Sequence, residues 1–230
     1  MSVIENWSAF KNQKVRFSTL LLMIVIVVAF ISMRSGEQRK SLDFAASLDE
    51  VAVTVDGTEL TLRDVAFYVA YEEKVVEDEA YIYNPQDTSE YWNIHPNGTF
   101  IRGTAKKSAL DMAVHDRIFY AMAEKEGIML EEEEEKRLSN SQYDFNSDLE
   151  DEQREWLGVS EDELNESMRK LALAEKYQSI YAQIKNGSTE DYSVSGEAYQ
   201  KMLEGHEVTV NEDVWDRVDF GHITVHHKAS

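Results

Sequence analysis

The order of apolar and polar residues divides the chain into three kinds of segment. Residues 17–33 are apolar without interruption, residues 51–55 are β-branched except for one alanine, and residues 104–205 carry apolar positions at helical spacing. A helical spacing sustained over so long a stretch predicts a mainly α-helical fold. The short β-branched run predicts a small β element beside the helices.

The β-branched run opens a recognisable supersecondary unit. It is followed by Asp56-Gly57, a dipeptide typical of tight turns between strands. Thr61 and Asp64 then have the spacing of a capping box, which begins a helix. We therefore predict a strand, a tight turn and a helix in this order.

The helical segment contains no proline, and its glycines fall between the apolar stripes, as expected at helix ends. A second capping box, Ser160 to Glu163, opens the longer stripe, and an acidic helix is predicted from Glu131 to about Phe145. A short helix is predicted around Tyr199. The two long stripes are Leu110, Val114 and Ile118, followed later by Leu164, Met168, Leu171, Ala174, Tyr177, Tyr181 and Ile184.

After Gly205 the pattern changes to the alternation typical of strands. Val208 and Val210 begin it, and residues 217–225 continue it. Because a domain that begins and ends in strand can pair its two ends, we expect residues 51–55 to lie beside residues 217–225.

The apolar run from Phe17 to Met33 has the length of a short membrane span and is flanked by Arg16 and Arg34. A cleaved secretory signal and a buried core helix are the alternatives. The expected small-residue cleavage site is missing, and the run is apolar on every face. These features favour an uncleaved signal anchor, which makes the chain a single-pass transmembrane protein.

The anchor sets the predicted domain organisation. Residues 1–16 are a short basic cytoplasmic segment, residues 17–33 the transmembrane anchor, residues 34–49 a linker, and residues 50–230 one helical domain. Three basic residues lie on each side of the run, so charge alone does not fix its orientation.

Residues 84–103 hold both prolines of the chain and predict a long loop or an irregular hairpin. Aromatic residues are dense in and just before this loop. They can fill the domain's own core or form a platform that faces a bound polypeptide. The candidate binding residues are Tyr81, Tyr83, Tyr91, Trp92 and Phe100.

Composition excludes several classes of function. The chain has 44 acidic and 23 basic residues among its 230, giving a net charge of −21. Such a surface repels phosphate, so no nucleic-acid partner is expected. The absence of cysteine excludes disulfide bonds, thiolate zinc sites and cysteine nucleophiles.

Three further features were weighed as chemical sites. Carboxylates at the start of a helix, as in residues 131–135, are explained by the helix dipole and by solvation. His222, His226 and His227 could supply zinc ligands but lie at a frayed chain end. His115 sits in a helical stripe and is expected to be a residue at the boundary between core and surface rather than a base. We therefore predict no catalytic, cofactor or metal site.

The order of features resembles the bacterial extracytoplasmic foldase family that includes SurA and PrsA, whose helical chaperone part is similar to trigger factor. Three stretches carry the resemblance: the strand and turn of residues 51–61, the A-x-x-x-G-I step of residues 123–128, and residues 194–225. The last resembles the approach to a parvulin-type isomerase domain, with His222 in its first strand. Only five residues follow Val225, so the rest of that domain is missing from this chain.

The resemblance implies a SurA N-terminal-like chaperone domain placed outside the cytoplasm of a bacterial cell membrane. It predicts a non-catalytic protein that binds unfolded or secreted polypeptides. A structural or adaptor protein docking one cell-envelope or secretion partner is a second hypothesis. A peptidyl-prolyl isomerase relative with residual activity, dependent on His222, is a third. Oligomeric state is not assigned by the sequence.

Overall fold

Strand β1 (Val51–Val55) lies at the centre of a three-stranded antiparallel sheet of order β2-β1-β3. A tight turn joins it to β2 (Thr58–Thr61), and β3 (Val208–Val210) pairs with its other edge. Asp56 and Gly57 both have positive φ, 48° and 78°, as the predicted Asp-Gly turn requires. This computed structural model describes residues 41–221.

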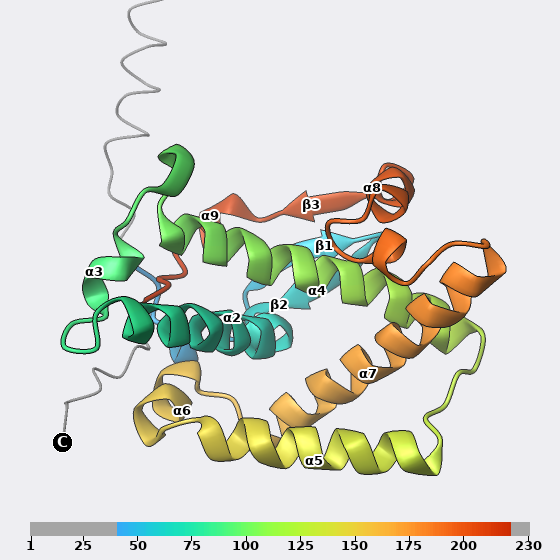
Figure 1. Ribbon diagram of the computed structural model, residues 1–230, viewed down its shortest axis with the longest axis horizontal. Coiled ribbons are helices and arrows are strands. Elements are labelled where there is room, and N and C mark those ends of the chain that lie inside the picture. The colour runs from blue at the N-terminus through green and yellow to red at the C-terminus, as the bar shows by residue number, and fades with distance from the viewer. Residues whose placement is uncertain (1–40, 222–230) are drawn as a thin grey trace, which may run out of the picture. The chain divides into compact units, whose positions relative to one another are not determined.

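Helices make up most of the described chain (Figure 1). The α-helices are α2 (Leu62–Tyr83), α3 (Ser89–Trp92), α4 (Ile101–Lys125), α5 (Glu132–Asp148), α6 (Asp151–Leu157), α7 (Glu161–Ile184), α8 (Glu197–Leu203) and α9 (Glu212–Trp215). Short 3₁₀ helices are η1 (Ala45–Ser47), η2 (Pro96–Gly98) and η3 (Glu190–Tyr192).

Both predicted capping boxes are confirmed. Thr61 accepts a hydrogen bond from the backbone N–H of Asp64 at the start of α2, and Ser160 does the same for Glu163 at the start of α7. In each case the acidic side chain bonds back to the backbone of the capping residue. These local hydrogen bonds fix where the helices begin because they satisfy backbone donors that have no partner inside the helix.

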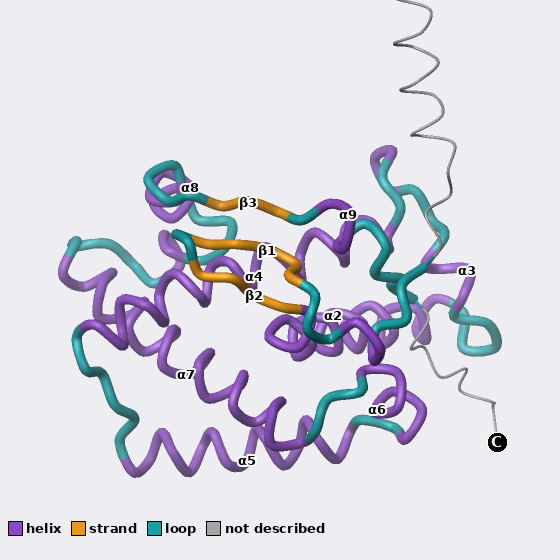
Figure 2. The backbone as a smooth tube through the Cα atoms, turned by 180° about the vertical axis from the view of Figure 1, so that it is seen from behind, coloured by secondary structure: helices purple, strands orange, loops and turns teal. Residues whose placement is uncertain are grey.

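The elements are arranged in layers. Helices α2 and α4 pack against the sheet, and α7 packs against α4 and α2. Figures 1 and 2 show α5, α6 and α7 on the side of α2 and α4 that faces away from the sheet. Helix α5 packs on α7 and forms the outermost layer.

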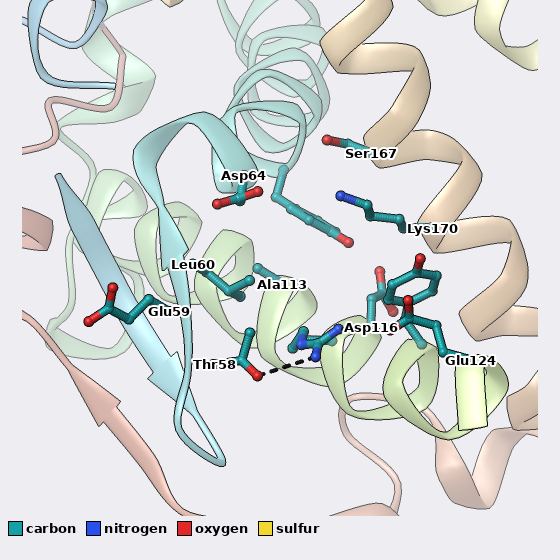
Figure 3. Close-up of a pocket in the computed structure, with 12 residues that line it drawn as sticks. Thr58, Glu59, Leu60, Asp64, Ala113, Asp116, Glu124, Ser167 and Lys170 are labelled. Atoms are coloured by element: carbon teal, nitrogen blue, oxygen red, sulfur yellow. Dashed lines mark hydrogen bonds and ion pairs between the residues drawn. The ribbon is translucent and has the colours of Figure 1, made fainter. Parts of the chain in front are cut away.

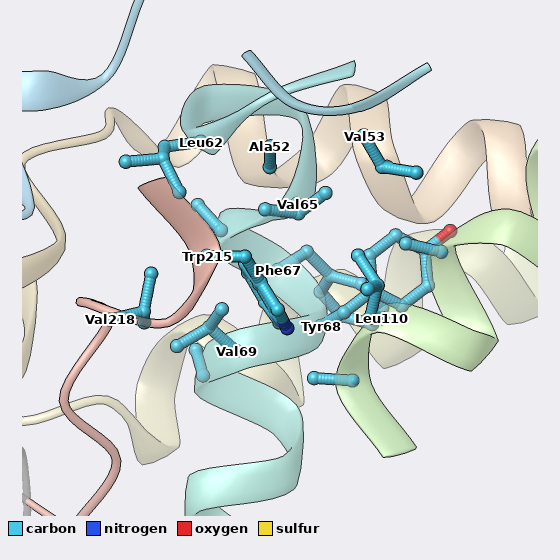
Figure 4. Packing of buried hydrophobic residues seen from close by; sticks show 14 of the residues in the cluster. Ala52, Val53, Leu62, Val65, Phe67, Tyr68, Val69, Leu110, Trp215 and Val218 are labelled. Carbon is cyan, nitrogen blue, oxygen red and sulfur yellow. The ribbon is translucent and has the colours of Figure 1, made fainter. Parts of the chain in front are cut away.

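The core lies between the sheet and α2, and the end of the described chain closes it (Figure 4). Val53 of β1 and Val65 of α2 are fully buried, and Trp215 and Val218 cover them with 4% and 2% exposure. Residues more than 150 positions apart in the sequence thus share one core, and burying them supplies the main stabilising free energy.

The predicted pairing of residues 51–55 with residues 217–225 is wrong. The partner of β1 is β3, with Val53 opposite Val210. Asn211 ends this ladder: its backbone N–H donates to the Ala52 carbonyl oxygen at 2.9 Å, and its side chain donates to the Val51 carbonyl oxygen at 2.9 Å. Helix α9 then turns the chain away, so residues 217–221 form turns, and residues 222–225 lie outside the described part.

The prediction of a single-pass membrane protein is also corrected. Within residues 41–221, no helix combines the length and the apolar character that crossing a membrane requires. The segment predicted as the anchor, Phe17 to Met33, lies outside the described residues, as does His222. The predictions of a transmembrane helix and of a membrane localisation are therefore withdrawn.

The second half of the predicted linker belongs to the domain. Leu42, Phe44 and Leu48 are buried, and the Phe44 ring stacks on Trp156 of α6 with ring centroids 4.7 Å apart. The close packing needs Gly158 at the end of α6, because a side chain there would collide with Ala45. The predicted loop 84–103 contains α3 and η2 and ends in the first residues of α4.

Candidate functional site

Helix α7 carries the longest apolar stripe of the sequence, and that stripe is only partly covered. Among its buried residues are Leu164, Met168 and Ala174, whereas Leu171 and Ala172 remain partly exposed. The surface beside these two residues is hollowed. A helix that shows apolar side chains in a hollow has the elements of a binding surface.

This hollow is a groove of about 480 Å³ between α5 and α7, here called the α5–α7 groove. Charged and hydroxyl side chains line it as well, among them Glu134, Arg137 and Glu175. Its apolar lining consists of Leu130, Leu138, Met168, Leu171 and Ala172. Apolar contacts and polar groups are thus combined along one opening.

Ion pairs tie α5 to α7 beside this groove. Lys176 bonds to Glu134 at 2.5 Å, and Arg169 forms a bidentate pair with Glu135. The Arg169 guanidinium holds the pKa of Glu135 below its usual value; the backbone N–H of Glu131, with Lys176, does the same for Glu134. Both carboxylates are therefore charged at neutral pH, although exposed pairs of this kind contribute little free energy.

Amide side chains tie the two helices together near the other end of α5. Asn146 donates to the Asn165 side-chain oxygen at 2.8 Å, and Gln142 donates to the Asn165 carbonyl oxygen at 2.9 Å. Polar contacts thus connect α5 and α7 at both ends, and the apolar lining lies between these contacts.

A second hollow lies on the other side of α7, where this helix faces α2 and α4. It measures about 320 Å³ and is here called the aromatic cavity, because Phe67, Tyr68 and Tyr71 of α2 line it. Leu171 and Glu175 line both the aromatic cavity and the α5–α7 groove. Burial, with the nearby Asp116 carboxylate, raises the pKa of Glu175.

A buried polar network forms one wall of the aromatic cavity. The Nε2 atom of His115 lies 2.9 Å from the Tyr192 carbonyl oxygen, which can only accept, so Nε2 carries a hydrogen. The Nδ1 atom lies 2.7 Å from Asp116 Oδ1, and one proton must occupy that contact as well. Burial raises the pKa of Asp116, while its hydrogen bond to His115 opposes the rise.

This network cross-links the fold. His115 is 4% exposed, not at the boundary as expected from the sequence, and both its ring nitrogens have partners. The Tyr68 hydroxyl donates to Asp116, which joins α2 to the pair. With both nitrogens engaged, His115 has none to offer a substrate as a base.

Figure 3 shows a third hollow of about 390 Å³, lined by residues of β2, α2, α4 and α7. Several of its charged side chains have partners within the protein. Arg117 pairs with Glu124 at 3.5 Å and donates to the Thr58 hydroxyl at 3.3 Å, and Asp64 caps α2. These side chains are held by contacts within the fold and are not left for a ligand.

The structure separates the five candidate aromatic residues into two groups. Trp92 is buried and donates to Glu77 at 3.1 Å, and Tyr91 is half-buried with its hydroxyl 2.8 Å from Glu79. Tyr81, Tyr83 and Phe100 are exposed by 48%, 59% and 44%. Trp92 and Tyr91 thus belong to the packed part of the domain, and a binding role for the three exposed residues stays a prediction.

The sequence analysis missed two parts of the exposed apolar surface. Ile82, beside the exposed tyrosines, is 83% exposed and would have been found by searching for all large apolar residues instead of aromatic ones. The α5–α7 groove was missed because its walls come from two separate stripes, and no local signal states how far apart two helices pack.

Within residues 41–221, no three His, Asp or Glu side chains lie where they could hold a metal ion together. The other histidines weighed as ligands, His226 and His227, lie outside the described residues. Comparisons with protein-family models, with curated proteins and with solved structures gave no match for this chain. The resemblance to the SurA and PrsA family therefore stays a prediction.

Proposed function

We propose that this protein is a non-catalytic, chaperone-like binder of unfolded polypeptide segments, and that the α5–α7 groove is where it holds them. The observation that carries the proposal is the apolar lining shared by the groove and the aromatic cavity through Leu171. An unfolded chain offers apolar side chains at irregular spacing, and two adjoining hollows can take up neighbouring ones.

The dimensions fit a short peptide segment. The groove is lined from Leu130 to Ser141 and from Met168 to Ser179, which corresponds to about 17 Å of helix length. An extended segment of about five residues would span that distance. The polar groups along the groove could meet the backbone of such a segment, which needs hydrogen-bond partners wherever it is removed from water.

The lining residues fit low sequence specificity. Met168 lines the groove and Met112 lines the aromatic cavity. Methionine is flexible and polarisable, so it adapts to ligands of different shape. The net charge of −21 supports the proposal in a different way. Mutual repulsion between negatively charged complexes keeps their exposed apolar segments from associating.

The test is suppression of aggregation of a chemically denatured client by the full chain. We expect suppression at a near-equimolar ratio. Ala172→Glu places a charge in the apolar lining and should abolish most of it, while Gln183→Glu adds the same charge to α7 outside the groove and should not. Absence of suppression by the unmodified chain at severalfold excess would refute the proposal.

A second candidate function, docking to one dedicated partner, is favoured by a different surface. Tyr81, Ile82 and Tyr83 are exposed together at the end of α2. If this surface is the functional one, affinity capture with the full chain should yield a single stoichiometric protein. Ile82→Asp should then abolish the capture, and Ala172→Glu should leave it unchanged.

A further inference from the structure

The last described residues, 211–221, form a strap that returns across the domain and closes its core. Most of its apolar side chains are deeply buried. These are Val214, Trp215, Val218 and Phe220, with exposures between 1% and 5%. The strap contains only the short helix α9, so it is held by tertiary contacts more than by secondary structure.

Polar contacts fasten the strap along its length. The Lys106 ammonium donates to the Asp216 carbonyl oxygen at 2.9 Å, and the Leu42 backbone N–H donates to the Arg217 carbonyl oxygen at 2.8 Å. At its end, the Gly221 backbone N–H donates to Glu73 Oε1 of α2 at 2.5 Å. Gly221 has φ of 85°, and a side chain there would collide with the Trp92 ring.

The carboxyl group that receives the strap belongs to a buried acidic pair. Glu73 and Glu77 are 2% and 7% exposed and lie one turn apart on the same face of α2. Each has one oxygen with a donor: Glu73 has Gly221, and Glu77 has the Trp92 indole N–H. The other two oxygens, Glu73 Oε2 and Glu77 Oε1, are buried without a hydrogen-bond partner.

Two ionised carboxylates cannot remain so close in a buried site without a large free-energy cost. Arg102 of α4 and Asp219 of the strap are the other charged groups that act on Glu73, with opposite signs. The Arg102 guanidinium lies 3.7 Å from Asp219, so its charge is shared with that residue. A proton on Glu73 removes the charge of this deeply buried carboxyl group and with it most of that cost.

We propose that Glu73 is protonated in the closed form, that its neutral carboxyl group holds the strap closed, and that loss of the proton to solvent at raised pH releases the strap from α2. Ionisation of Glu73 adds a negative charge that Asp219 of the strap repels. This repulsion acts on the segment that ends in Gly221. Release exposes the apolar side of the strap and the part of α2 beneath it.

The titration range follows from the environment of the pair. Burial raises the pKa of Glu73 to about 8; the Gly221 N–H opposes this rise, and the charges of Glu77 and Asp219 add to it. A carboxyl group with a raised pKa stabilises the closed form fully below its unfolded pKa of 4.5. That stabilisation is lost as pH rises towards 8.

The test is hydrogen exchange of the full chain followed by mass spectrometry between pH 6 and pH 9, corrected for intrinsic exchange. Protection of peptides covering residues 211–221 should fall by about tenfold or more, because one unit of pKa corresponds to a tenfold population change. Peptides from β1 should change far less. Glu73→Gln should keep the strap protected at pH 9, and Asp78→Asn, an exposed acid on the same helix, should behave like the unmodified chain.

Equal loss of protection in Glu73→Gln and the unmodified chain, or strap protection independent of pH in the latter, would overturn the proposal. If Glu73→Gln does not fold, infrared spectroscopy of the unmodified chain decides. The carbonyl stretch of protonated carboxyl groups should lose intensity between pH 6 and pH 9, over the range in which the strap loses protection. A constant intensity over that range would equally overturn the proposal.

Discussion

Helices α4 and α5 differ in how much of their surface the domain covers. Helix α4 has 25 residues and buries ten of them, against the sheet, α2 and α7. Helix α5 has 17 residues and buries two, Leu138 and Asn146. Both helices follow from the sequence pattern, but α4 contributes far more of its residues to the core than α5 does. Stability is thus concentrated around α4, and the apolar surface available for binding lies beside α5.

The largest expected effect on stability comes from a substitution in the buried face of α4. Phe119 is fully buried and contacts the rings of His115, Tyr181 and Tyr199. Phe119→Ala should lower the free energy of unfolding by about 3–5 kcal/mol, since it removes a large side chain and leaves a cavity. Urea unfolding followed by circular dichroism measures this. A loss below about 1 kcal/mol would show that α4 is not the centre of stability.

The next effect is a dependence of stability on pH within the body of the domain. Because the raised pKa of Glu73 makes ionisation costly only in the folded state, stability should fall as pH rises from 4.5 to about 8. The loss is at most on the order of 5 kcal/mol, or the free energy of opening the strap if that is smaller. Glu73→Gln should remove most of this dependence in urea titrations at several pH values. An unchanged pH profile in this variant would contradict the prediction.

A smaller effect on stability is expected from a substitution in α5, and it tests whether α5 opens separately from α4. Leu138→Ala should cost about 2 kcal/mol, at the lower end for such substitutions, because the adjoining groove already leaves one side of Leu138 open. Hydrogen exchange should show faster opening of residues 132–148 with little change in α4. If α4 loses protection equally, α5 and α4 unfold as one unit.

The smallest effect concerns the ion pair between Glu135 and Arg169. Glu135→Gln should leave the urea midpoint nearly unchanged and accelerate exchange of α5 amides by no more than a few-fold, since both partners are exposed. Added salt should weaken α5 protection in the unmodified chain more than in this variant. A large loss of global stability would mean that this pair, and not the apolar contacts, holds α5 in place.

Features set by neighbouring residues were predictable from the sequence. The Asp56-Gly57 turn and the capping boxes at Thr61 and Ser160 depend on hydrogen bonds within four residues, and all three are found as expected. Helix α6 was not predicted, because seven residues carry too short a pattern to show periodicity.

Features set by long-range packing were not predictable in the same way. Val214, Val218 and Phe220 are spaced much as in a strand, but the edge of β1 is already occupied by β3, so they pack as an irregular strap. Leu42 and Phe44 stand among polar residues, and only their packing with α6 shows that they belong to the core. The α5–α7 groove depends on how two helices are tied together by Glu134, Lys176 and the amides near Asn165.

The sheet order β2-β1-β3 has a consequence for how the protein is made. Val53 pairs with Val210, so one edge of β1 has no partner until β3 has been synthesised. At about 5–20 residues per second, the residues between them take about 8–30 s to translate. During that time a β-branched strand edge is open to pairing with other chains. The nascent protein is therefore exposed to aggregation through β1 until β3 emerges from the ribosome.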